Sequence, residues 1–258
     1  MRKLKGSVNG MLARFGYVLT KHESIINSRA VDVAQMIGMF EKLNEYLLPD
    51  NEERTRLMAQ LIGTSLMEGM YIVKCLNRVL SVEGDICEFG VAQGATSAFM
   101  ANEIRWTEKH IWLFDSFKGL PRPSRKDYLI NDIFELGSMD AYEGKMASPE
   151  YLVRQRLMKI QFPPERTHVV SGFFPASATT NAPDKICFSY IDFDLYQPIL
   201  DALHFVDQRM PPGGCITVDD YGWFSRGVQQ AVDEFRANNA RFELHLPQGE
   251  HFAILQKM

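Results

Sequence analysis

The chain has 258 residues, of which 46% are apolar and 23% charged, and its formal net charge is −4. This composition is ordinary for a globular protein with one α/β domain and an appendage, and the charge gives no general case for nucleic-acid binding. Apolar stretches are shorter than the roughly 20 residues that a membrane-spanning helix needs, so we expect no transmembrane segment. The four cysteines form no C-x-x-C pair, which favours a reducing cytoplasm over a disulfide framework.

Charge is distributed unevenly along the chain. Residues 1–21 carry five basic side chains and no acidic one, so this arm is +5 and the remainder is −9. A basic arm of this kind can make weak peripheral contact with an anionic membrane or partner. The alternative is a solvated arm or a first helix that packs on the body of the protein.

Residues 23–80 have the pattern of helices. Apolar side chains recur at helical spacing at Met36, Phe40, Leu43 and Leu47. The stretch "PDNEERTRLMAQLI" is typical of a turn followed by an acid-capped helix start, and residues 63–80 continue the helical pattern despite Gly63 and Gly69. We therefore predict an N-terminal arm and helical extension over residues 1–83.

The pattern changes from residue 84 onward, where short apolar runs alternate with amphipathic segments. Near-continuous apolar strands separated by helices indicate a parallel sheet that is covered on both faces. The last two runs, "RFELHLP" and "HFAILQKM", are joined by only "QGE". A parallel crossover needs a dozen or more residues, so these two strands are predicted to be antiparallel.

A glycine-bearing turn follows the first of these strands, in "GDICEFGVAQGATSAFMA". Gly90 and Gly94 allow close backbone approach to a ligand, and the next helix points its free N–H groups into the same space. The following strand ends in Asp115, where nucleotide-binding α/β folds place an acid that accepts hydrogen bonds from ribose hydroxyls. Together these features favour the binding of a cofactor that contains a nucleoside, either NAD or S-adenosylmethionine.

Two observations favour S-adenosylmethionine over NAD. The Tyr-x-x-x-Lys sequence "YVLTK" lies far upstream of the glycine loop, which is the wrong place for the proton-transfer machinery of a dehydrogenase. The antiparallel last pair of strands is also the characteristic ending of S-adenosylmethionine-dependent methyltransferases.

Five stretches in order then resemble the macrocin O-methyltransferase (TylF/MycF-like) family: "GDICEFGVAQGATS", "LFDSFKGLP", "VVSGFFPAS", "YIDFDLYQPILDAL" and "PPGGCITVDDYG", with "GVQQAVDEF" following. The resemblance covers residues 80–258. It implies a class I, Rossmann-like methyltransferase domain over residues 84–258, with a seven-stranded, mostly parallel sheet and an antiparallel last strand. It also implies that the extension serves as a lid or dimer element, so we expect a homodimer or higher homo-oligomer.

In the methyltransferase sheet, the fourth and fifth strands are neighbours about 4.8 Å apart. Asp192 ends the fourth strand, and Asp219 and Asp220 end the fifth, so three carboxylates are expected beside the cofactor. Carboxylates packed this closely repel one another unless a cation lies among them, and oxygen ligands of this kind suit Mg²⁺. Asp194 immediately precedes the next helix and is interpreted as its N-cap.

The resemblance implies a role for each matched residue. Asp192 is expected to be a metal ligand and the general base, with Asp219 and Asp220 as the other ligands. The residues expected to bind the cofactor are Glu88, Gly90, Gly94, Thr96, Ser97, Asp115, Ser116, Ser171, Gly172 and Asp192. Glu88 is expected to support the glycine loop or contact the cofactor, and Tyr221 and Trp223 either line the acceptor pocket or belong to the core.

The predicted function is therefore S-adenosylmethionine- and Mg²⁺-dependent methylation of a sugar hydroxyl on a glycosylated natural product or glycan. A divalent cation lowers the pKa of a bound hydroxyl, and a carboxylate then takes its proton. One alternative is a catechol-type O-methyltransferase, which needs a flat aromatic pocket. Another is a non-catalytic nucleotide-binding scaffold with the same fold.

Overall fold

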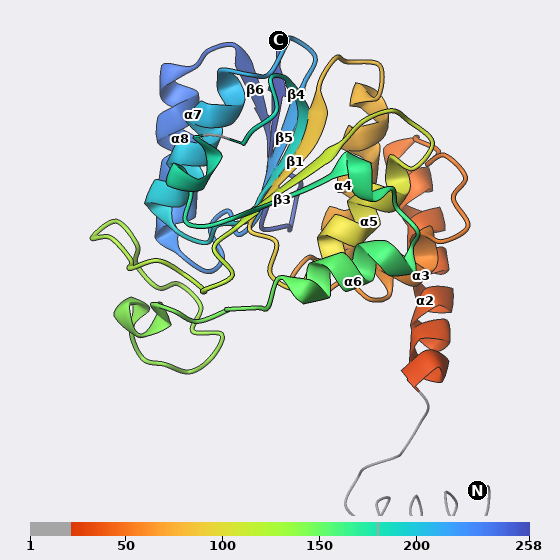
Figure 1. Cartoon of the computed structure of the whole chain (residues 1–258), viewed down its shortest axis with the longest axis horizontal. Helices are drawn as coiled ribbons and strands as arrows, with labels where there is room; N and C mark the ends of the chain where they lie inside the picture. Colours follow the sequence, from red (N-terminus) through yellow and green to blue (C-terminus); the bar gives the residue numbers. More distant parts are fainter. Residues whose placement is uncertain (1–21, 180) are drawn as a thin grey trace, which may run out of the picture.

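A computed structural model describes residues 22–179 and 181–258, so the basic arm over residues 1–21 lies outside the described part of the chain. A twisted sheet separates two layers of helices (Figure 1). One layer contains α7 (Tyr196–Asp207) and α8 (Arg226–Asn238), and the other contains α4 (Leu66–Val79), α5 (Ala95–Glu103) and α6 (Tyr151–Lys159). In the described residues, no helix combines the length and hydropathy that crossing a bilayer requires.

The sheet has seven strands in the order β3-β2-β1-β4-β5-β7-β6. Their bounds are β1 Asp85–Phe89, β2 Ile111–Asp115, β3 Thr167–Ser171, β4 Ile186–Ile191, β5 Cys215–Val218, β6 Phe242–His245 and β7 Ala253–Lys257. Neighbouring strands from β3 to β5 are parallel, whereas β7 is antiparallel to both β5 and β6. The predicted fold class is confirmed.

Strand register brings three loops to one edge of the sheet. Phe89 at the end of β1 pairs with Ile191 of β4, which in turn pairs with Val218 of β5. The ladder continues one residue further, because Asp192 N donates to Phe89 O at 2.7 Å and Asp219 N donates to Ile191 O at 2.9 Å. The residues that follow β1, β4 and β5 are therefore held side by side.

The extension forms the predicted helices α2 (His22–Asn44) and α4, with the short helix α3 (Arg54–Met58) between them. The helix start predicted in this stretch is present at Arg54, but the predicted acid cap is wrong, because no side chain caps α3. Ser65 instead caps α4, accepting from Glu68 N at 3.0 Å. The hydroxyl of a serine satisfies one of the amide groups that a helix start leaves free.

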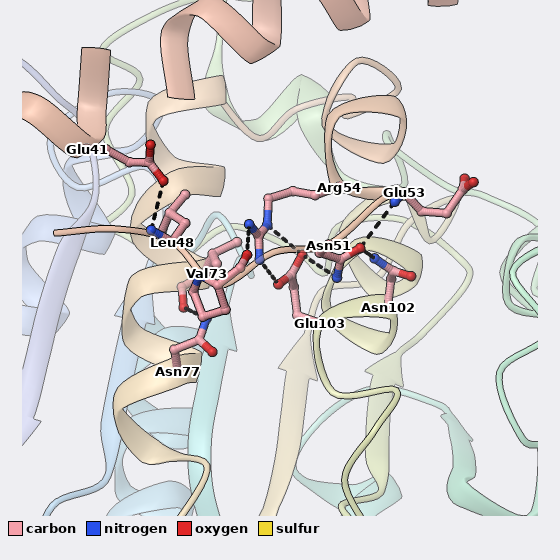
Figure 2. A network of polar contacts seen from close by, with 10 residues as sticks. Glu41, Leu48, Asn51, Glu53, Arg54, Val73, Asn77, Asn102 and Glu103 are labelled. Carbon is pink, nitrogen blue, oxygen red and sulfur yellow. Dashed lines mark hydrogen bonds and ion pairs between the residues drawn. The ribbon is translucent and has the colours of Figure 1, made fainter. Parts of the chain in front are cut away.

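Polar and apolar contacts join the extension to the sheet domain. Buried residues of α2 and α4 share one hydrophobic cluster with residues of β1, β2, β4 and α5. Figure 2 shows Arg54 of α3 paired with Glu103 at the end of α5, with Nη2 and Oε2 2.7 Å apart. Both side chains are at most 6% exposed, so the pair is a buried connection between the two parts of the chain.

Candidate active site

A cavity of about 850 Å³ opens at the carboxyl-end edge of the sheet. Its floor contains residues from the ends of β1, β2, β4 and β5. Among the described residues, seven acidic side chains and one basic side chain, Arg122, line it; the acids are Glu88, Asp115, Asp192, Asp194, Asp201, Asp219 and Asp220. An excess of carboxylates of this kind favours cations over anions in the cavity.

The glycine loop approaches the end of β4 very closely. Gly90 has φ 87°, and a Cβ at this position would lie 1.8 Å from the Asp192 carbonyl oxygen. Only glycine fits both the conformation and the space. Gly94, with φ 76°, is the N-cap residue that immediately precedes α5. The sequence pattern therefore identified a real close approach, here between two parts of the chain that both line the cavity.

Asp115 holds the glycine loop through its carboxylate. Its Oδ2 accepts from Val91 N at 2.7 Å and from Ala92 N at 2.8 Å, and its Oδ1 accepts from Phe117 N at 2.7 Å. The side chain is half-buried and lines the cavity. Three amide donors bound to one carboxylate fix the turn after β1 relative to the turn after β2.

Glu88, Ser97 and Thr96 support the loop from within the fold. Ser97 Oγ donates to Glu88, whose side chain is 1% exposed. Burial raises the pKa of Glu88 well above its usual value. Thr96 Oγ1 lies 2.7 Å from Thr64 Oγ1, so α5 is also tied to the segment that precedes α4. These contacts agree with the interpretation that Glu88 supports the loop.

Three carboxylates converge at the ends of β4 and β5. One ligand atom each from Asp192, Asp194 and Asp220 lies within 4.8 Å of the other two. Asp192 and Asp220 were predicted to meet here, whereas the third member is Asp194 in place of Asp219. Asp219 lines the cavity beside them, but its Oδ2 accepts from Tyr190 Oη at 2.9 Å and its Oδ1 accepts from Asp220 N at 2.7 Å.

Protein atoms surround these acids closely although the cavity leaves them partly accessible. Burial, followed by repulsion from Asp219, raises the pKa of Asp192 well above its ordinary value. Burial raises the pKa of Asp194 to about 7, and burial followed by repulsion from Asp219 raises that of Asp220 to about 9. Shifts in this direction are expected where several carboxylates gather in a largely buried place, because burial and mutual repulsion both disfavour the charged form.

The interpretation of Asp194 as a helix N-cap is wrong. The residue before α7 is Leu195, and no side chain from this position caps the helix. The amide of Tyr196 donates instead to Oδ1 of Asp127 at 2.7 Å, from a loop distant in sequence. Because Asp127 caps the helix, the Asp194 carboxylate is free to face Asp220. The backbone of Asp194 has a left-handed φ of 61°, and the residue lines the cavity.

Glu68 of α4, in the extension, is buried and lies near enough to Asp219 and Asp220 for their charges also to raise its pKa. Its side chain is 1% exposed, and its Oε1 has no hydrogen-bond partner among the described residues. Burial, followed by the charge of Asp219, raises the pKa of Glu68 well above its usual value. Sequence reasoning missed this residue because Glu68 occupies the first turn of an amphipathic helix, where an acid is ordinary.

The remaining predicted positions divide into two groups. Thr96 and Ser116 line the cavity with Glu88, Gly90 and Asp115. The other four predicted cofactor residues are not among the lining residues: Gly94, Ser97, Ser171 and Gly172. Ser171 Oγ donates to Glu150 Oε2 at 2.5 Å, and its neighbours Phe173 and Phe174 line the cavity instead.

The outer walls of the cavity are apolar. Trp223, which was expected either to line the acceptor pocket or to belong to the core, lines the cavity. The other apolar side chains of these walls are Ile62, Ile133, Phe134 and Phe173. Each of these side chains is more than 40% exposed. Ile133 and Phe134 belong to the irregular connection between β2 and α6, where the sequence offers no periodic signal. Tyr221 is not among the lining residues and donates to Asp233 Oδ1 at 2.7 Å.

Comparison with known protein families gives a match over most of the chain. The profile of the macrocin O-methyltransferase (TylF) family matches residues 21–245. The chain belongs to the TylF family. Family membership agrees with the resemblance noted in the sequence, and the matched range includes most of the extension and the sheet domain as far as β6.

Two curated relatives of this TylF-family chain are named as O-methyltransferases. A tetracenomycin 4′-O-methyltransferase of Streptomyces olivaceus, named for a dimethoxyrhamnosyl substrate, is 28% identical over 63% of this chain and 62% of its own length. Demethyldecarbamoylnovobiocin O-methyltransferase of Streptomyces niveus is 28% identical over 69% of this chain and 67% of its own length. The chain thus spans about two thirds of these relatives or slightly less.

Solved structures support the fold. The O-methyltransferase NovP superposes with a TM-score of 0.65 at 22% identity, covering 89% of this chain and 99% of NovP. The calicheamicin methyltransferase CalS11 gives a TM-score of 0.57 at 19% identity, covering 93% and 95%. At these identities the likeness shows that the chain has the class I methyltransferase fold.

Proposed function

We propose that this TylF-family chain is an S-adenosylmethionine-dependent O-methyltransferase that acts on a sugar hydroxyl of a glycosylated natural product or glycan. The observation that carries the proposal is the meeting of a glycine loop and an acidic cluster in one cavity. The relatives support the sugar acceptor, since their names describe methylation of rhamnosyl and novobiocin-type substrates. The apolar walls suit the aglycone that such acceptors carry.

The glycine-loop side of the cavity is proposed to bind the cofactor. Gly90 gives the methionine portion access to the loop backbone, and Asp115 is placed to accept from ribose hydroxyls at the cavity surface. Glu88, Thr96 and Ser97 hold the loop from behind. Residues of the proposed adenine side are Ser116, Ser171 and Gly172, and binding there requires Ser171 to exchange its bond to Glu150 for the ligand.

The acidic cluster is proposed to hold Mg²⁺. Three carboxylate oxygens within 4.8 Å of one another suit a hard divalent cation, which prefers oxygen ligands. Two ligand sets are candidates, and both contain Asp192 and Asp220. The third ligand is Asp219 according to the family pattern and Asp194 according to the observed distances. When bound, the ion supplies charge that acidifies an acceptor hydroxyl.

Asp192 is proposed to be the general base. Its carboxylate lies where the floor of the cavity meets the glycine loop, because its own carbonyl contacts Gly90. It takes the proton of the acceptor hydroxyl while that oxygen attacks the sulfonium methyl group. The carbon–sulfur bond breaks as the carbon–oxygen bond forms, and the products are the methyl ether and S-adenosylhomocysteine.

The extension is proposed to contribute to self-association and to cover the site. Ile62 from the segment after α3 lines the cavity, which supports a covering role for residues 1–83. On α2 and the segment after it, Leu43 and Leu47 are 78% and 81% exposed, and apolar side chains exposed in this way support a homo-oligomer. Light scattering on Leu43→Glu tests this: a dimer that dissociates supports it, and an unchanged mass argues against it. We also propose a cytoplasmic location.

A direct test measures cofactor binding and methyl transfer separately. Calorimetry should show that S-adenosylhomocysteine binds and that NAD does not. Mass spectrometry should show transfer to p-nitrophenyl α-L-rhamnopyranoside, and EDTA should abolish it. Transfer to catechols alone would favour the catechol-type alternative. Binding of S-adenosylhomocysteine without turnover of any hydroxyl acceptor would favour the non-catalytic scaffold. Transfer that persists in EDTA would refute the metal requirement.

A further inference from the structure

Residues 116–150, which connect β2 to α6, form one wall of the cavity. The segment contains a single short 3-10 helix, Met139–Tyr142, and Figure 1 shows it as a green lobe below α7 and α8. Its apolar contributions to the cavity include Leu120, Ile133, Phe134 and Met146. Since little regular structure stiffens the segment, its position depends on how it is anchored.

The strongest anchor is the carboxylate of Asp127, which is 6% exposed. Its Oδ2 accepts from Ser124 N at 2.8 Å and from Ser124 Oγ at 2.6 Å. Its Oδ1 accepts from Tyr196 N at 2.7 Å and from Ser225 Oγ at 3.2 Å. None of the ion pairs in the described residues includes Asp127, so hydrogen bonds alone satisfy this buried charge.

These contacts connect the starts of two helices. Tyr196 is the first residue of α7, and Ser225 is the N-cap of α8, where it accepts from Gly227 N at 3.0 Å. One buried carboxylate therefore lies at the positive ends of both helix dipoles. A Cβ on Gly227 would lie 2.0 Å from Asp127 Oδ1, so the glycine is what allows α8 to approach this carboxylate.

The same two helices follow the turns that present the acidic cluster. Asp192 and Asp194 lie immediately before α7, and Asp219 and Asp220 lie between β5 and α8. The wall is bound to the second turn as well, because Ile130 N donates to Phe224 O at 2.9 Å and Asn131 Nδ2 donates to Trp223 O at 2.7 Å. Asp127 thus joins the wall to both acid-bearing turns.

We propose that Asp127 is a positioning residue for methyl transfer, which holds the acceptor-side part of this wall, residues 119–148, against the two turns that carry the acidic cluster. The inference rests on the proposed function, since it assigns the wall to the acceptor. The glycine loop has its own fastening through Asp115. Loss of the Asp127 contacts therefore disturbs acceptor alignment and leaves cofactor binding intact.

The test compares Asp127→Asn with Asp140→Asn. The control removes the same charge from the same segment, at an exposed residue whose side chain makes no hydrogen bond with other described residues. Asparagine has one acceptor oxygen where aspartate has two, so Asp127→Asn cannot satisfy both sets of donors. We expect a KM for p-nitrophenyl α-L-rhamnopyranoside about ten-fold higher, with the KM for S-adenosylmethionine within about two-fold of the wild type.

Hydrogen exchange supplies a measurement that needs no acceptor. In Asp127→Asn, amides of residues 128–134, 195–199 and 226–229 should exchange at least about five-fold faster, while S-adenosylhomocysteine binding stays within about two-fold. Ser225→Ala removes the Asp127–Ser225 bond together with the cap of α8 and leaves the Tyr196 and Ser124 bonds in place. It should give a smaller change over residues 128–134, and it serves as the test if Asp127→Asn does not fold. Failure of the wild type to methylate any glycoside would count against the proposed function, and the exchange result would still decide on Asp127.

Two results would overturn the inference. One is unchanged exchange at both helix starts, which would mean that Asp127 does not hold the segment. The other is a variant whose melting temperature and active fraction decrease while the acceptor KM of the folded enzyme equals that of the wild type. That outcome would assign Asp127 to stability alone, because KM does not depend on how much enzyme is active.

Discussion

Replacing Asp115 should weaken both cofactor binding and the stability of the cofactor-free protein. Asp115→Ala removes three acceptor contacts of 2.7–2.8 Å, to Val91 N, Ala92 N and Phe117 N. A hydrogen bond to a charged group contributes about 1.5–3 kcal/mol, but water replaces part of it at a half-buried site. We therefore expect a total loss of roughly 2–4 kcal/mol, which in a chain of this size lowers the melting temperature by about 5–10 °C.

The cofactor measurement is calorimetry with S-adenosylhomocysteine. A misplaced loop and unpaired ribose hydroxyls should together weaken binding by about 10- to 100-fold. Asp115→Asn is the matched comparison, because its single acceptor oxygen can still serve Val91 and Ala92, so about half of the stability should return. If Asp115→Ala melts at the wild-type temperature without ligand, the loop-fastening role is refuted. If affinity for S-adenosylhomocysteine is unchanged, the cofactor role is refuted.

Three further predictions test the packing, the glycine loop and the metal. Arg54→Ala should lower the free energy of unfolding by about 3–5 kcal/mol, because it leaves the buried Glu103 without its ion-pair partner. The control is Arg56→Ala, which breaks an exposed pair and should lower the free energy of unfolding by about 1 kcal/mol or less. Urea denaturation of the two variants measures the difference. Gly90→Ala should abolish S-adenosylhomocysteine binding in calorimetry, since its Cβ would collide with the chain at 1.8 Å. Asp192→Asn should lose about 10²–10⁴-fold in kcat even at saturating Mg²⁺, while Asp220→Asn should be partly rescued by excess Mg²⁺.

Each of these has a contrary outcome. Equal urea midpoints for the two arginine variants would show that the buried pair adds nothing to stability. Normal cofactor affinity in Gly90→Ala would show that the loop can move away from β4. An Asp192→Asn enzyme that turns over normally would exclude this residue as the base. Comparing Asp194→Asn with Asp219→Asn in Mg²⁺ titrations would then identify the third ligand, since the true one should weaken metal affinity more.

The sheet and the edge at which the site lies could be predicted from sequence because both depend on short-range patterns. A parallel strand between two helix layers is apolar along its length, as Cys187, Phe188 and Tyr190 are in β4, and it ends where Gly or Asp appears. Neighbouring parallel strands end at one edge, so the meeting of Asp192 and Asp220 follows from topology. Of the apolar walls the sequence offers only Trp223 as a candidate; Ile133 and Phe134 could not be predicted, because they lie in a segment without periodicity.

The assignment of individual carboxylates failed where the decisive partner lies far away in sequence. Asp194 precedes a helix and has the local pattern of an N-cap, yet the amide of Tyr196 is bound by Asp127, 69 residues distant. A helix start needs only one such acceptor at that amide, so the more distant acid frees the nearer one. Tertiary structure therefore decides which aspartate caps a helix and which one faces the cavity. Asp194 lies in the cavity because Asp127, and not Asp194, accepts the hydrogen bond from the first amide of α7.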